Sequence, residues 1–217
     1  MPRRTLTQEA IVDAAVAVAG RREVESITGR VLGEELGVDR SAIWRHFADQ
    51  DALLRAIGDR LLQTALAEVP EGLAPHDRMT AFARALVSVF AAHPAIGAVI
   101  GGRTTRGPGE FAVVEFTLTA LTEVGVPADR IAAQQRMIAD TVLGYASLRA
   151  HQELLPPDLR RGDVQAWSGS YAAASPQAHP AIARHALELA QVSDDQVLEA
   201  LLEALWASVK TIVLEGE

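Results

Sequence analysis

Side chains able to recognise nucleic acid are concentrated in the seven residues from Arg40 to His46. Arg45 is the strongest candidate for a base contact, since a guanidinium can donate two hydrogen bonds to O6 and N7 of guanine. A phosphate contact is the alternative for the same side chain. Trp44 adds an aromatic plane and an indole N–H donor. The other residues expected on this outer face are Arg40, Ser41, Ala42 and His46. Alone, such a segment would favour an ordinary solvated helix face. The Gly37 turn before it, an exposed Trp44 between basic residues and the flanking helices together favour contact with a duplex.

Two short helices around a tight turn are expected to present this segment. Thr28 can accept a hydrogen bond from an unpaired amide at the start of the first helix. Gly37 can adopt the left-handed conformation that ends it. A second helix, capped by Asp39, would run from Arg40 to Phe47 and bury Ile43. This arrangement is typical of a helix-turn-helix.

The composition narrows the class of protein. The chain has 217 residues, 49% of them hydrophobic, and no Cys, so disulfides and thiolate metal sites are excluded. No apolar stretch approaches the length of about 18 residues that a membrane span needs. The N-terminal residues have no apolar segment of secretory type behind them. A cytoplasmic globular protein that does not bind a membrane is expected.

Charge is distributed unevenly along the chain. The net charge is −8, but residues 1–50 hold seven arginines and eight acidic residues and so contribute little of it. A surface that binds DNA would therefore have to be positive only locally. The arginines expected on that surface are Arg3, Arg4, Arg30, Arg40 and Arg45.

Helical periodicity continues through the rest of the chain, and no segment alternates like a strand, so the fold class is predicted to be all-α. The further helices are expected over residues 6–20, 49–68, 76–93, 110–125, 127–154 and 180–191, and from Ser193 to the end, with a short apolar piece over residues 95–100. Ser193 and Gln196 form a capping box for the last helix. Residues 155–177 are expected to be irregular, with Trp167 and Tyr171 as anchors.

Several positions at fixed spacing carry a family resemblance: Leu6-Thr7, Ile11, Ala14-Ala15, Ile27-Thr28, Leu36-Gly37-Val38, Ile43-Trp44-Arg45-His46-Phe47 and Ala52-Leu53-Leu54. With them, residues 6–55 resemble the TetR family of transcriptional regulators. Beyond that region the resemblance rests on the number and order of the helices. Trp44 stands where the family usually has Tyr, and Gln50 where it often has Lys.

The resemblance implies a ligand-responsive repressor. It implies a homodimer with two recognition helices in successive major grooves of a pseudo-palindromic operator. Residues 1–48 would bind DNA, and residues 49–217 would form a helical domain that dimerises and encloses a small-molecule effector. Thr28 and His46 would touch phosphates, as would the amides at Gln50. Ser41, Ala42, Trp44 and Arg45 would face base edges or the adjacent backbone, and Arg3 and Arg4 the minor groove or its phosphates.

Candidates for the effector cavity are mostly apolar and aromatic, as ligand pockets are: Phe82, Phe90, Ile100, Phe111, Phe116, Met137, Thr141 and Tyr145. For most of them, ordinary core packing is the alternative. Thr141 and Tyr145 stand out because two hydroxyls one turn apart on an apolar face need partners, either within the chain or on a ligand. The dimer interface is expected on the last two helices, at Leu198, Leu201, Leu205 and Val209.

Catalysis is not expected. The histidines lack the helical spacing of metal ligands, and no nucleophile elbow or phosphate-binding loop is present, so no metal, cofactor or catalytic residue is predicted. Two other functions remain open: a helical ligand-binding protein whose helix-turn-helix no longer binds DNA, and an all-α enzyme that uses the C-terminal cavity.

Overall fold

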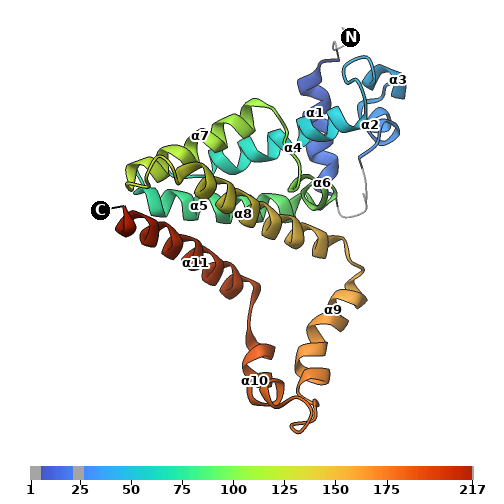
Figure 1. The fold of residues 1–217 in the computed structure, drawn as a ribbon. Coiled ribbons are helices and arrows are strands. Elements are labelled where there is room, and N and C mark those ends of the chain that lie inside the picture. The colour runs from blue at the N-terminus through green and yellow to red at the C-terminus, as the bar shows by residue number, and fades with distance from the viewer. Residues whose placement is uncertain (1–5, 22–26, 217) are drawn as a thin grey trace. The chain divides into compact units, whose positions relative to one another are not determined.

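The computed structural model describes residues 6–21 and 27–216, and within these ranges every regular element is helical (Figure 1). The elements are α1 (Gln8–Ala19), α2 (Gly29–Leu36), α3 (Arg40–Ile43), α4 (Gln50–Ala67), α5 (Pro75–Ala92), α6 (Pro94–Ile100), α7 (Pro108–Glu123), α8 (Ile131–Leu154), α9 (Pro157–Ala166), the π-helical turn η1 (Trp167–Tyr171), α10 (Pro180–Gln191) and α11 (Asp194–Glu215). This confirms the all-α fold class. No helix in the described ranges has the length and apolar character needed to cross a bilayer.

The helix starts follow the capping residues of the sequence. The side-chain oxygens of Thr7, Thr28 and Asp49 accept hydrogen bonds from the amides three residues ahead, at 3.1, 3.3 and 2.7 Å. Ser193 and Gln196 form the reciprocal pair of a capping box, at 2.8 and 3.2 Å. Each cap supplies a partner for an amide that has none within the helix. The predicted starts of these helices are therefore confirmed.

Three boundaries differ from the prediction. The second helix of the helix-turn-helix ends at Ile43, and residues 44–46 form a tighter turn in which His46 N–H donates to the Ile43 carbonyl at 3.0 Å. Pro127 does not open α8, which begins at Ile131 after a turn. Residues 157–166, expected to be irregular, form α9, a helix without a buried residue.

The N-terminal helices share one small core. Ile11 and Ala15 of α1, Leu32 of α2, Ile43 of α3 and Leu53 of α4 are fully buried. Gly37 ends α2 with φ 65°, in the left-handed region that glycine adopts without a Cβ clash. The predicted helix-turn-helix is therefore present, and its core fixes the exposed side of α3.

The larger helices of the same compact unit, residues 1–154 with 209–217, form a bundle around a second core. In Figure 1, α4 lies beside α7, and α5 lies beside α8. Phe90 and Ile96 are completely buried between these helices. The helix α4 contacts α1 at one end and α5, α6 and α7 along its length, so it joins the helix-turn-helix to the bundle.

Residues 155–208 form a separate compact unit of α9, η1, α10 and the first part of α11. Within this unit, which is described throughout, Ala186 and Leu198 are the buried hydrophobic residues. Trp167 and Tyr171 stack on each other with ring centroids 4.5 Å apart, but both rings remain exposed. The expectation that these two residues anchor the segment in a core is therefore wrong.

Candidate DNA-binding surface and ligand cavity

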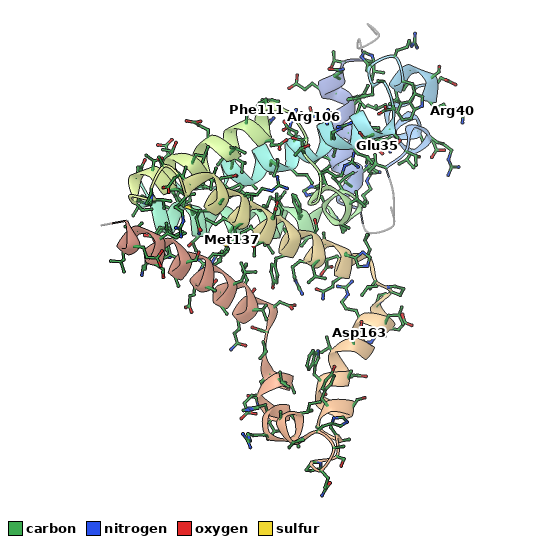
Figure 2. The ribbon with its side chains drawn as sticks, in the orientation of Figure 1. Glu35, Arg40, Arg106, Phe111, Met137 and Asp163 are labelled. Carbon is green, nitrogen blue, oxygen red and sulfur yellow. The ribbon has the colours of Figure 1, made fainter. Side chains whose placement is uncertain are left out.

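The outer side of α3 and its following turn carries cationic and polar side chains. Arg40, Ser41 and Arg45 are exposed, and so is Arg30 on α2. Arg40 lies at the outer edge of the helix-turn-helix (Figure 2). The Ser41 amide donates to Asp39 at 2.8 Å, and the hydrogen bonds from Ser41 hold the pKa of the Asp39 carboxyl below its usual value. These side chains can therefore reach a duplex without rearrangement of the helix.

Trp44 is held flat against the start of α2. A Cβ added at Gly29 would lie 2.6 Å from Cζ2 and 2.9 Å from Nε1 of the Trp44 indole. Any larger residue at position 29 would therefore have to displace the ring. The indole is still 37% exposed. Gly29 thus sets the position of an aromatic side chain that remains available to a ligand.

Three other predicted contacts are wholly or partly withdrawn from the surface. Ala42 is buried, so the expectation that it lies on the outer face is wrong. His46 is half-buried, and its carbonyl accepts a hydrogen bond of 2.6 Å from the Gln8 side chain. Thr28 is half-buried and caps α2. Arg3 and Arg4 lie outside the described residues.

Gln50 connects the start of α4 to the segment before α2. Its side-chain amide donates to the Ile27 carbonyl. The side chain therefore stabilises the helix-turn-helix, while the backbone amides at the N-terminus of α4 keep the positive end of the helix dipole. Just after α1, Arg21 donates hydrogen bonds to both carboxylate oxygens of Glu35 in α2, at 2.7 and 2.8 Å, and these hydrogen bonds lower the pKa of that carboxyl.

A cavity of about 470 Å³ lies within the bundle, a size typical of sites for small organic molecules. It is lined by residues of α4, α5, α7 and α8 and of the segment after α6. The lining residues are Leu62, Met79, Phe82, Ala83, Leu86, Gly101, Gly102, Arg103, Thr104, Glu110, Val113, Val114, Phe116, Thr117, Gln135, Arg136, Ile138, Ala139, Asp140, Val142, Leu143, Gly144 and Ser147.

Of the effector candidates named from the sequence, Phe82 and Phe116 line this cavity, with their ring centroids 5.6 Å apart. The other six are not in its lining. Phe90 and Ile100 belong to the core, and Phe111 and Met137 are exposed. Thr141 and Tyr145 are half-buried, and the Thr141 hydroxyl donates to the Met137 carbonyl at 2.7 Å.

The polar part of the lining was not among the candidates named from the sequence. Arg103 and Thr104 come from residues 101–109, the segment between α6 and α7. Arg136 and Asp140 face each other one turn apart on α8, with Nε 2.8 and 2.7 Å from the two carboxylate oxygens. Such i, i+4 pairs are common on exposed helix faces, so the pattern alone does not indicate a cavity.

Of the residues expected at the dimer interface, Leu198 and Val209 are already buried within one copy of the chain. Leu201 and Leu205 are half-buried. Large apolar residues are more exposed on the neighbouring helix, where Leu187 of α10 is 73% accessible. Among the described residues, no group of three or more His, Asp or Glu side chains could hold a metal ion.

Comparison with known proteins places this architecture in a class of helix-turn-helix regulators. Residues 11–57 match the family described as bacterial regulatory proteins, tetR family. Residues 73–211 match the tetracyclin repressor-like C-terminal domain. The second match covers more than half of the chain. The chain therefore belongs to the TetR family, as the resemblance of residues 6–55 predicted.

Two curated relatives carry regulator names. One is an HTH-type transcriptional regulator of Saccharopolyspora erythraea, 28% identical over 68% of this chain and 64% of that protein. The other is the HTH-type transcriptional repressor DrrR1 of Streptomyces coeruleorubidus, 25% identical over 76% of this chain and 62% of that protein. The match thus spans less than two thirds of either relative.

Two solved structures show the extent of the similarity in fold. The TetR family protein ActR of Streptomyces coelicolor, in complex with actinorhodin, has a TM-score of 0.84 at 20% identity and covers 99% of this chain and 100% of its own. BioQ bound to its natural double-stranded DNA operator has a TM-score of 0.57 at 25% identity, covering 73% of this chain and 93% of its own. At 20% identity, the similarity to ActR shows the fold alone.

Proposed function

We propose that the chain is a ligand-responsive, DNA-binding transcriptional repressor that acts as a homodimer and leaves its operator when a small molecule fills the cavity. The observation that carries the proposal is the joint exposure of Arg40, Ser41 and Arg45 on α3 and its following turn, beside the indole of Trp44. A segment of this kind fits the major groove, where guanidinium groups read guanine and hydroxyl groups bind phosphate.

Membership of the TetR family supports the proposal, as do the relatives named as a regulator and a repressor. These names favour a regulator over the all-α enzyme. The two functions are assigned to the regions predicted from the sequence. Residues 1–48 would bind DNA, and residues 49–217 would bind the effector and dimerise. Such a protein would work in the cytoplasm.

The helix α4 gives this proposal a physical route between the two sites. Its first turn holds the segment before α2 through Gln50, and Leu62 further along the same helix lines the cavity. A ligand that binds one arrangement of α4 better than another shifts the population of the two. Two recognition segments must lie about 34–36 Å apart to bind successive major grooves. A small tilt of α4 would therefore move one segment out of its groove, and contact with one half-site would be lost.

Selection of bound duplexes from a random pool tests DNA binding and reports the half-site spacing. The full chain should enrich a pseudo-palindrome with half-sites about one helical turn apart. Arg45→Ala should weaken binding to the selected duplex by about 1–3 kcal/mol. Arg161→Ala serves as the control, because this exposed arginine lies on α9. Failure to enrich any duplex, at low salt as well, would instead favour the ligand-binding protein without DNA.

A further inference from the structure

Arg103 connects the cavity to the helix that supports the DNA-binding segment. Its side chain belongs to the cavity lining and donates a hydrogen bond to Asp51 in the first turn of α4. Asp51 lies outside the lining and also accepts a hydrogen bond from Arg55 on its own helix. Two arginines therefore share one carboxylate, and Asp51 keeps a partner if Arg103 turns away.

The other charged groups of the lining have partners within the lining or in residues 105–106. Arg136 and Asp140, both in the lining, pair with each other through two hydrogen bonds. Glu110 accepts the Arg106 amide at 2.6 Å and the Thr105 hydroxyl at 3.1 Å. It also lies in the first turn of α7, where the helix dipole favours a negative charge. Among these four charged residues, Arg103 is the one whose charged partner lies outside the lining.

The Arg103–Asp51 pair can be exchanged at low energetic cost. The Arg103 side chain is 46% exposed and that of Asp51 34%, and ion pairs this open to water contribute little to stability. An anion inside the apolar cavity would meet the same guanidinium with less competition from solvent, where a charge-assisted hydrogen bond is stronger. A cation would have to displace the two donors on Glu110 and would be repelled by Arg103.

We propose that the cavity accepts an apolar molecule with one anionic group, and that this group binds Arg103 in place of Asp51. The apolar body would lie against Phe82, Phe116, Val113 and Leu143, which line the same cavity. This inference rests on the proposed function, because it names the chemical class of the effector and the side chain that recognises it.

The exchange also has a consequence for regulation. The Arg103–Asp51 pair ties the segment after α6 to the first turn of α4, one residue from Gln50, which bonds the Ile27 carbonyl. A ligand that takes Arg103 from Asp51 removes this tie. The start of α4 then loses one of its connections to the cavity when the effector is bound.

Two fluorescent probes with nearly the same aromatic body test the ligand class on the full chain. Anilinonaphthalene sulfonate carries one negative charge, and N-phenylnaphthylamine carries none. The sulfonate should bind the unmodified protein more tightly than the uncharged probe. Arg103→Gln should weaken sulfonate binding by about tenfold or more while changing the binding of the uncharged probe less than about twofold.

Asp51→Asn should strengthen sulfonate binding, because Arg103 then has no competing carboxylate. The matched control is Arg106→Gln, in the same segment but outside the lining. This variant should retain the preference for the sulfonate. Circular dichroism of each variant should show unchanged helix content and thermal midpoint. A loss of probe binding is then caused by the altered site and not by unfolding.

Three results would overturn the inference: no sulfonate binding by the unmodified protein, an equal loss of both probes in Arg103→Gln, or an equally selective loss of the sulfonate in Arg106→Gln. Binding of the same proteins to the selected duplex is measured without probe. If the unmodified protein does not bind the duplex, the proposed function is contradicted. The two-probe comparison tests the ligand class alone.

Discussion

Oδ2 of Asp59 in α4 accepts a hydrogen bond of 2.9 Å from the backbone N–H of Gly109 in α7. The other carboxylate oxygen accepts the Glu110 amide at 2.9 Å and the Thr105 hydroxyl at 2.8 Å. Asp59 is buried, so a side chain of one helix caps the N-terminus of another where water has little access. The approach is close, since a Cβ on Gly109 would lie 2.4 Å from the Asp59 carbonyl oxygen.

Removal of this carboxylate should destabilise the bundle. Asp59→Ala leaves the Gly109 and Glu110 amides without their partner, and we expect a loss of about 1–3 kcal/mol in the free energy of unfolding by urea. Glu115→Ala, at an exposed position of α7, is the control and should change it by less than about 0.5 kcal/mol. Equal stability of the two variants would mean that Asp59 does not hold α7 to α4.

The contact between Trp44 and Gly29 predicts a separate effect on DNA binding. Gly29→Ala places a methyl group where the indole now lies, so the ring must move out of its position. Binding to the selected duplex should weaken, and the tryptophan emission should shift, with little change in helix content. Gly162→Ala, on α9, is the control, because a Cβ there meets nothing within 4 Å. Unchanged duplex affinity for Gly29→Ala would remove Trp44 from the interface.

Local sequence chemistry was sufficient to predict most of the helices. A cap such as Thr28 or Ser193 acts on amides two or three residues away, so its effect can be inferred without knowledge of the tertiary structure. The end of α3 could not be predicted in this way. Ile43 and Phe47 are both buried, but residues 44–46 between them form a turn instead of a continued helix. A spacing of four residues fits either conformation.

The cavity depends on contacts between distant segments, and the sequence carries little information about them. Phe82 and Phe90 lie on the same helix, yet Phe82 lines the cavity and Phe90 is in the core. Their side chains are chemically identical, so only the positions of neighbouring helices distinguish them. Arg103 and Asp51 are 52 residues apart, and nothing in either segment indicates that they pair.

Exposed apolar side chains on α10 predict the site of dimerisation. Leu187 is 73% exposed, and burial of such a residue against a second copy would stabilise a dimer. Leu187→Glu should therefore shift the protein toward monomer in light scattering after gel filtration. Val99→Glu, at an exposed position of α6, is the matched control and should remain dimeric. A Leu187→Glu protein that remains fully dimeric would argue against an interface on α10.

Gln50 offers a way to raise DNA affinity. It lies at the N-terminus of α4, where the TetR family often has Lys, and its side chain now donates to the Ile27 carbonyl. Gln50→Lys can keep a donor at this position and adds a positive charge beside the expected phosphate. Each further phosphate neutralised should steepen the dependence of log affinity on log salt by about 0.9.

We therefore expect Gln50→Lys to bind the selected duplex more tightly at low salt and with a steeper salt dependence than the unmodified chain. Gln165→Lys adds the same charge at an exposed position of α9 and controls for the change in net charge. If both variants gain affinity equally, the effect is one of overall charge. If only Gln50→Lys gains affinity, a DNA phosphate lies at the start of α4. An added charge releases further counterions from the DNA only where it contacts a phosphate.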